Sequence, residues 1–201
     1  MLFRSGAGNL LGPQQSGCLA AVGYETYLSM LEATIDELRG KPHEAEVDPE
    51  IRLPVTARLP ESYVSAVSQR LVLYKRLASA PDEADLERIR DEILDRYGAL
   101  PQEATNLVGV IRLKVLARNL GVGSVDLVRG ELVLATGASS RVDPERLVNL
   151  LTQAGSGVHV TADHRILAPA PQEADADLLL ASAERLLRDL GARAPTPVRG
   201  S

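Results

Sequence analysis

The stretch from residue 125 to residue 134 reads VDLVRGELVL, and the pattern of the chain changes here. Apolar residues on both sides flank Arg129-Gly130-Glu131, which predicts two short strands joined by a tight hairpin turn. From residue 60 to about residue 120 the apolar residues recur at helical spacing, whereas strand-like and helical patterns alternate beyond the hairpin. The fold class therefore depends on what precedes and follows this hairpin.

Three helices are predicted before the hairpin. The first begins at Pro60, a residue favoured at the first helical position, and runs to about residue 79. Asp82 caps the second, and the third opens at Pro101 and ends at Gly121. The residues predicted to face the core are Val64, Val67, Leu71, Tyr74 and Ala78 in the first helix, Leu86, Ile89, Ile93 and Tyr97 in the second, and Ala104, Leu107, Val108, Ile111 and Val115 in the third.

Two helices and a second hairpin are predicted after residue 140. Asp143-Pro144 provides a cap and a first-position proline for a helix with Leu147, Leu150 and Leu151 facing inward. Ala162-Asp163-His164 is the candidate turn of the second hairpin, and residues 174–190 form the last helix. This order predicts an α+β fold, with a helical subdomain followed by a small, mainly antiparallel sheet with helices.

Composition divides the chain into four parts. Residues 1–40 contain a predicted helix over 24–39, and residues 41–50 are an acidic linker with two prolines. A domain over residues 51–192 and a flexible tail over 193–201 follow. Residues 51–59 alternate between apolar and polar side chains, but Pro54 cannot donate to a strand ladder, so an edge strand or an extended arm is predicted there.

The overall composition limits the classes of function. With 22 basic and 27 acidic residues, the net charge of −5 excludes a strongly basic nucleic-acid wrapper. Five tyrosines, one phenylalanine and no tryptophan disfavour a stacking platform for single-stranded nucleic acid. The single cysteine excludes an intrachain disulfide, and no apolar run approaches the ~20 residues of a membrane helix. We expect a cytoplasmic protein without a membrane partner.

No catalytic or metal site emerges from the motifs. The glycines at residues 6–12 follow no apolar strand and precede no Gly-Lys-Ser/Thr, so a nucleotide site is disfavoured. His159 and His164 lack an evident third ligand, and Cys18 has no histidine nearby in the sequence. We therefore predict no catalytic residue and no metal ligand.

Charged residues offer two kinds of surface. Acidic residues of the helix over 82–96 alternate with arginines, which is typical of a solvated helix face but also fits a docking surface for a basic partner. Two small basic groups lie on the neighbouring helices; they are normally solubility or ion-pair residues, but they could also contact phosphates. These groups are Arg70, Lys75 and Arg76, and Arg112, Lys114 and Arg118.

Two N-terminal stretches carry a resemblance to a known family. Residues 6–17 read GAGNLLGPQQSG and residues 22–31 read VGYETYLSML. They resemble the translocation motif of bacterial transcription-repair coupling factors, which the RecG branch-migration helicase shares. The match continues over residues 51–64, 69–78 (QRLVLYKRLA) and 95–101 (DRYGALP), which are similar to the coupling factors' C-terminal domain, absent from RecG. The resemblance covers about residues 6–190.

The resemblance implies a C-terminal fragment of an ATP-dependent double-stranded DNA translocase. Such a protein removes stalled RNA polymerase and recruits the repair protein UvrA. This sequence has no Walker A loop or acidic Mg²⁺ motif, so ATP and Mg²⁺ are expected only in the full-length protein, and the fragment alone is expected to be neither an enzyme nor a cofactor binder. Residues 1–40 would be the helical C-terminal end of the second RecA-like motor lobe.

The resemblance also implies individual residues. The translocation motif would include Gly6, Gly8, Gly12, Gln15 and Gly17. Gln15 matches the glutamine of the family's coupling pair. The paired arginine is expected directly before Gly6, where this chain has Ser5, with Arg4 one position earlier.

The family's C-terminal domain is regulatory, and this implies an intramolecular partner. It packs on the UvrB-like N-terminal module and masks the surface that binds UvrA. In this chain Asp91, Glu92 and Asp95 would contribute to that docking, although the helix could also be simply solvated. An alternative of another class is a stand-alone α+β module that binds nucleic acid or protein, the former through Arg70, Lys75 and Arg76.

Overall fold

The structure is a computed structural model that describes residues 48–137, 140–171 and 175–191. The chain divides into two units, Met1–Glu44 and Ala45–Ser201, and the described residues all belong to the second. The predicted helix over 24–39, the glycine motif and Cys18 lie outside the described residues. The domain boundaries predicted from composition remain predictions.

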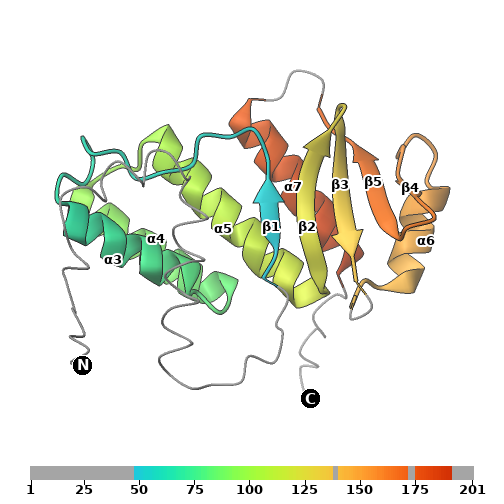
Figure 1. Cartoon of the computed structure of the whole chain (residues 1–201), viewed down its shortest axis with the longest axis horizontal. Helices are drawn as coiled ribbons and strands as arrows, with labels where there is room; N and C mark the ends of the chain where they lie inside the picture. The colour runs from blue at the N-terminus through green and yellow to red at the C-terminus, as the bar shows by residue number, and fades with distance from the viewer. Residues whose placement is uncertain (1–47, 138–139, 172–174, 192–201) are drawn as a thin grey trace, which may run out of the picture. The chain divides into compact units, whose positions relative to one another are not determined.

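The described residues form an α+β fold in the predicted order of three helices, hairpin, helix, hairpin and helix (Figure 1). One short strand precedes the first helix. The elements are β1 (Glu50–Arg52), α3 (Val67–Ala78), α4 (Glu83–Tyr97), α5 (Gln102–Leu120), β2 (Val122–Val128), β3 (Glu131–Thr136), α6 (Pro144–Thr152), β4 (His159–Val160), β5 (Arg165–Pro169) and α7 (Ala176–Leu190). The predicted fold class is confirmed.

The strands form one sheet in the order β1-β2-β3-β5-β4. β2–β3 and β4–β5 pair antiparallel, as the two predicted hairpins require. β3 and β5 also pair antiparallel, whereas β1 pairs with β2 in parallel. The β2–β3 turn consists of Arg129 and Gly130, with φ values of 52° and 84°. Two successive left-handed residues match the right-handed twist of the strands, and glycine adopts this conformation without steric cost.

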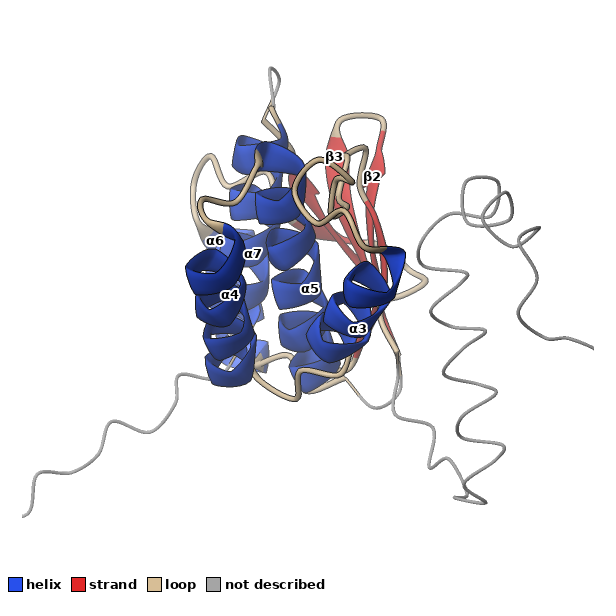
Figure 2. Cartoon of the chain, turned by 90° about the vertical axis from the view of Figure 1, so that its left-hand side faces the viewer, coloured by secondary structure: helices blue, strands red, loops and turns tan. Residues whose placement is uncertain are grey.

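Helix α5 occupies the centre of the domain. Figure 2 shows the helices gathered on one side of the strands. The core residues predicted on α5 (Ala104, Leu107, Val108, Ile111 and Val115) are all buried, and so are Val110, Leu113, Leu116, Ala117 and Leu120. The helix therefore contacts the sheet with one side and other helices with the rest. Gly121 ends it at a φ of 65°, which satisfies the last carbonyls of the helix.

The helix caps were predictable from the sequence. The Asp82 carboxylate accepts a hydrogen bond from the Asp85 amide at 2.8 Å, and Asp143 and Asp175 cap α6 and α7 in the same way. Gly98, with a φ of 84°, directly follows the end of α4. The described residues include no helix long and apolar enough to cross a bilayer.

Two details of the predicted helices were wrong. The first helix begins at Val67 and not at Pro60, because residues 60–63 form a separate turn and Ala66 is extended. This break shifts the helix phase, so Val67 is 54% exposed, whereas Leu73 and Leu77 are buried. On α6, Leu147 and Leu150 pack against the core, but Leu151 is 39% exposed, because this helix covers only the margin of the core and buries no residue fully.

Residues 51–59, in which apolar and polar side chains alternate, form both an edge strand and an extended arm. β1 lies at the edge of the sheet and ends at Arg52, two residues before Pro54. The arm then runs from β1 to the turn before α3 (Figure 1). Every second side chain faces the core: Ile51 and Leu59 are buried, and Leu53, Val55 and Ala57 pack against the core cluster.

Candidate docking surface

Helix α4 carries the acidic residues singled out by the sequence. Leu86 and Ile93 are buried, and they fix which side of α4 faces the domain. Residues on the opposite side are exposed, among them Asp91 and Asp95, which lie four positions apart and therefore project from the same helix face. The apolar stripe thus determines that these carboxylates point to solvent.

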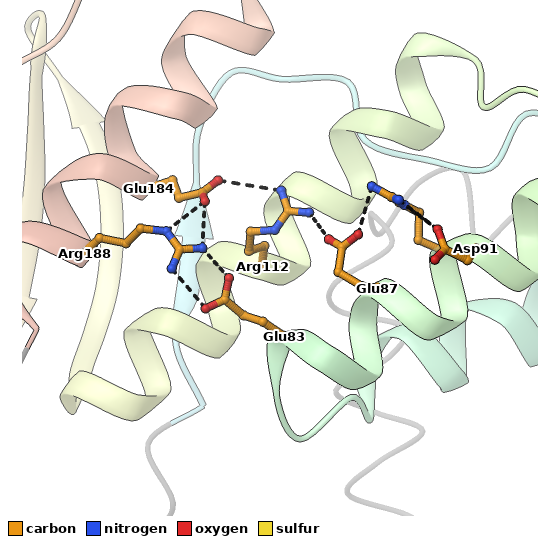
Figure 3. Close-up of polar contacts among 7 residues, drawn as sticks. Glu83, Glu87, Asp91, Arg112, Glu184 and Arg188 are labelled. Carbon is orange, nitrogen blue, oxygen red and sulfur yellow. Dashed lines mark hydrogen bonds and ion pairs between the residues drawn. The ribbon is translucent and has the colours of Figure 1, made fainter. Parts of the chain in front are cut away.

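The first half of α4 is tied to α5 and α7 by a chain of ion pairs (Figure 3). Arg112 of α5 contacts Glu87 and lies 3.6 Å from Glu184 of α7. Arg188 of α7 contacts both Glu184 and Glu83. Because Glu83 and Glu87 are neutralised within the domain, their charges serve the packing of α4 rather than an outside partner. The hydrogen bonds that Arg188 donates to Glu83 and Glu184 raise the pKa of Arg188.

Glu92 is also paired with a residue of the same domain. Arg76 of α3 donates two hydrogen bonds to its carboxylate, at 2.7 and 2.6 Å. These bonds lower the pKa of Glu92 and raise the pKa of Arg76. A bidentate arginine–carboxylate pair fixes both side chains. Of the three candidate docking residues, Glu92 therefore joins α4 to α3.

Asp91 and Asp95 are the candidate docking residues that pair with no other element of the described part of the chain. The Asp91 side chain is 64% exposed, and it pairs with Arg90 of its own helix at 2.8 Å. Asp95 is exposed and makes no ion pair with any residue that the structure describes. Arg90 also contacts Glu87 at 2.8 Å, so Asp91 lies at the exposed end of the ion-pair chain.

The sequence analysis missed Leu94. Its side chain is 42% exposed and lies three positions after Asp91 and directly before Asp95. Buried Leu86 and Ile93 place the core side of α4 elsewhere, so the spacing of the apolar stripe could have identified Leu94 as an outward-facing leucine. We call Asp91, Leu94 and Asp95 the α4 surface, an exposed apolar side chain and two exposed carboxylates on one helix.

A tyrosine pair fixes the end of α4 next to this surface. The rings of Tyr63 and Tyr97 lie 5.9 Å apart, and the Tyr63 hydroxyl donates to the Gly98 carbonyl at 2.7 Å. Burial raises the pKa of Tyr63. The Arg96 guanidinium lies 5.3 Å from the centre of the Tyr97 ring. These contacts join the C-terminal end of α4 to the segment that precedes α3.

Most of the basic side chains named from the sequence have partners inside the domain. Arg70 donates to the carbonyls of Val64 and Ser65 at 2.7 and 2.9 Å, and Arg76 binds Glu92. Lys114 and Arg118 each lie 3.7 Å from the Asp48 carboxylate. Lys75 is exposed. Most of these basic side chains are therefore paired within the domain and are not available to bind an outside partner.

The two histidines in the described part of the chain are exposed at the second hairpin. His159 lies in β4, and His164 lies in the turn with a φ of 60°. Among the described residues, no group of three metal-ligating side chains could hold an ion. Gly6, Gly8, Gly12, Gln15 and Gly17 lie outside the described part of the chain.

The fold and the α4 surface define a small α+β domain that presents a charged, internally braced helix. Comparison with known proteins gives the family. The TRCF domain matches residues 53–147. The chain is 36% identical over 185 residues to the transcription-repair-coupling factor of Myxococcus xanthus, covering 92% of this chain. It is 34% identical over 151 residues to that of Escherichia coli K12, covering 73% of this chain.

A solved structure has the same fold. The crystal structure of the C-terminal domain of transcription-repair coupling factor aligns with a TM-score of 0.59, covering 71% of this chain and 94% of that chain at 18% identity. The chain belongs to the transcription-repair-coupling factor family. It spans only 15% of the Myxococcus xanthus protein and 13% of the Escherichia coli protein.

Proposed function

We propose that this chain is the C-terminal regulatory part of an ATP-dependent double-stranded DNA translocase. The complete protein would remove stalled RNA polymerase and recruit nucleotide excision repair in the cytoplasm. Membership of the transcription-repair-coupling factor family supports this assignment. ATP and Mg²⁺ are assigned to the rest of that protein, because this sequence contains no Walker A loop. The chain itself would perform no covalent chemistry.

The regulatory step would be competition for one surface. The domain docks on a UvrB-like N-terminal module of the same protein and masks the site that binds UvrA. Because both parts belong to one chain, docking occurs at a high effective concentration and excludes a free partner. A rearrangement of the motor shifts the equilibrium towards the undocked state and exposes the UvrA site.

The exposed α4 surface is the observation that carries this proposal. Asp91 and Asp95 present two carboxylates on a helix that is braced against α3, α5 and α7. A braced helix loses little conformational freedom on docking, and exposed carboxylates select a basic partner surface. Leu94 adds an exposed apolar side chain on the same helix.

Calorimetric titration of the whole chain against the separately expressed N-terminal module tests the proposal. We expect binding that weakens when Asp91 and Asp95 are both changed to lysine. Glu145→Lys, at an exposed acid on α6, is the matched control and should bind like the unchanged chain. If the Asp91 and Asp95 double variant and Glu145→Lys both bind like the unchanged chain, docking occurs through another surface. Absence of binding by two methods, with both pieces folded, would contradict the regulatory assignment.

Residues 1–40 are assigned a separate role in the same protein. We assign Gly6, Gly8, Gly12, Gln15 and Gly17 to the translocation motif that couples ATP state to DNA movement. Supplying this chain to a motor fragment that lacks it should restore DNA translocation. Gln15→Ala should reduce the restored translocation without changing docking of the domain. Equal restoration by both chains would contradict the role of Gln15.

A further inference from the structure

The first twelve described residues form a strap along α5. At one end, the Asp48 carboxylate lies 3.7 Å from both Lys114 and Arg118, near the C-terminal end of that helix. At the other end, Arg58 contacts Glu103, in the first turn of the same helix. We call residues 48–59 the strap, with an outer part, residues 48–52, and an inner part, residues 53–59.

Buried groups fix the inner part of the strap. The Asn106 side chain, only 3% exposed, donates to the Thr56 carbonyl at 2.9 Å. The Leu59 amide donates to the Tyr74 hydroxyl at 2.7 Å, and the Leu59 side chain is 4% exposed. The Arg58 amide donates to the Glu103 carbonyl at 3.0 Å. Opening this part would break these buried hydrogen bonds, which is unfavourable.

Weaker interactions fix the outer part. β1 contributes three residues at the edge of the sheet and pairs only with β2, in the parallel arrangement. The Asp48 side chain is 51% exposed, and the Arg52 side chain, which contacts Asp126 at 3.3 Å, is 59% exposed. Exposed ion pairs contribute little and are screened by salt. Pro49 and Ile51 are the buried residues of this part, and their burial keeps it closed together with the ion pairs of Asp48.

From this contrast we infer that the outer part of the strap is a releasable latch, which opens while the inner part stays closed. Pro54 separates the two parts, and no strand pairing continues beyond Arg52, so no shared ladder couples them. Opening would add five residues, roughly 17 Å of chain, to the tether that precedes the domain. The folded core around Leu59 and Asn106 would remain intact.

A longer tether changes the effective concentration of the domain at a docking site in the same protein, in a direction set by the distance to be spanned. In this respect the latch rests on the proposed function, since it would adjust the strength of intramolecular docking. The opening itself requires no docking partner. It can therefore be tested on this chain alone, and failure of the docking proposal would not affect that test.

Hydrogen exchange of the whole chain, followed by mass spectrometry of peptides from the strap, tests the latch. In the unchanged chain we expect amides of residues 50–52 to exchange faster than those of Arg58 and Leu59. Asp48→Lys replaces attraction to Lys114 and Arg118 by repulsion, and it should speed exchange at residues 50–52 by about three- to tenfold. Exchange at Arg58 and Leu59 should not change. Glu145→Lys, an exposed charge reversal on α6, is the matched control.

Two results would overturn the inference. Equal exchange across residues 50–59, with a common acceleration in Asp48→Lys, would show that the strap opens as one unit. Unchanged exchange at residues 50–52 in Asp48→Lys would show that the ion pairs do not keep the latch closed. Circular dichroism of the variant confirms that the domain remains folded, which an exposed substitution should permit.

Discussion

Helices α4 and α5 lie side by side and have similar lengths, but they differ in which residues they bury. α5 buries eleven residues, and one of them, Asn106, is polar. α4 buries only Leu86 and Ile93 and presents charges over most of its remaining surface. This difference indicates that α5 is the scaffold of the domain, whereas α4 is a surface helix held in place by that scaffold. Mutations should therefore affect stability on α5 and binding on α4.

The largest expected effect is loss of stability on truncation of α5. Leu113 is 1% exposed in the core cluster, and Leu113→Ala should reduce the free energy of unfolding by about 2–5 kcal/mol, since it leaves a cavity. The matched change on α4, Leu94→Ala, removes the same atoms from a half-exposed site and should cost less than about 1 kcal/mol. Urea denaturation of both variants measures the difference. Similar losses would remove the distinction between scaffold and presented helix.

A smaller loss is expected from the buried polar residue of α5. Asn106 donates to the Thr56 carbonyl and accepts from the Gln102 side chain at 3.0 Å. Asn106→Ala would leave the Thr56 carbonyl without this donor and should cost about 1–3 kcal/mol. Gln102→Ala, at an exposed position, is the control and should cost less. If Asn106→Ala unfolds at the same urea concentration as the unchanged chain, the strap does not depend on this bond.

The contrast between the two helices was only partly predictable. Periodicity identified both helices, and Asp82 and Gly121 gave their ends, because caps are local interactions. The burial of α5 on more than one side was not predictable from one stripe, since Leu113 and Leu116 join a core cluster with residues of the sheet and α7 that are distant in sequence. The start of α3 was missed for a similar reason. Pro60 fits a helix start, but it begins a separate turn. The Tyr63 hydroxyl of this turn donates a hydrogen bond to the carbonyl of Gly98, 35 positions away in the sequence.

The acidic residues of the candidate site were predicted, but their partners within the domain were not. The sequence identified Asp91, Glu92 and Asp95 by charge, but it could not show that Glu92 binds Arg76 of another helix. Nor could it show that Asp48, in the predicted linker, contacts Lys114 and Arg118. These pairs join residues that are 16 to 70 positions apart, and no local pattern encodes them.

On the binding side, Leu94 provides the sharper test of α4. Leu94→Ser should weaken binding to the N-terminal module by about five- to tenfold, because docking would bury this exposed apolar side chain and the polar serine would lose that burial. Val148→Ser is the matched control, because Val148 is 55% exposed on α6. Titration calorimetry of both variants measures the effect. Equal affinities would show that the α4 surface acts by charge alone.

The smallest effect concerns the pH dependence of α4 packing. Arg76 lowers the pKa of Glu92, so the folded state binds that proton less readily than the unfolded chain. The pair therefore stabilises the fold above the ordinary glutamate pKa, and the stabilisation is lost as the pH falls through the lower, folded value. NMR titration should show the midpoint of Glu92 rising in Arg76→Gln. Lys75→Gln, at the exposed neighbouring position, should leave it unchanged. A midpoint that does not move in Arg76→Gln would mean that this pair does not fix α4 to α3, and Glu92 would then join Asp91 and Asp95 as a residue open to a partner.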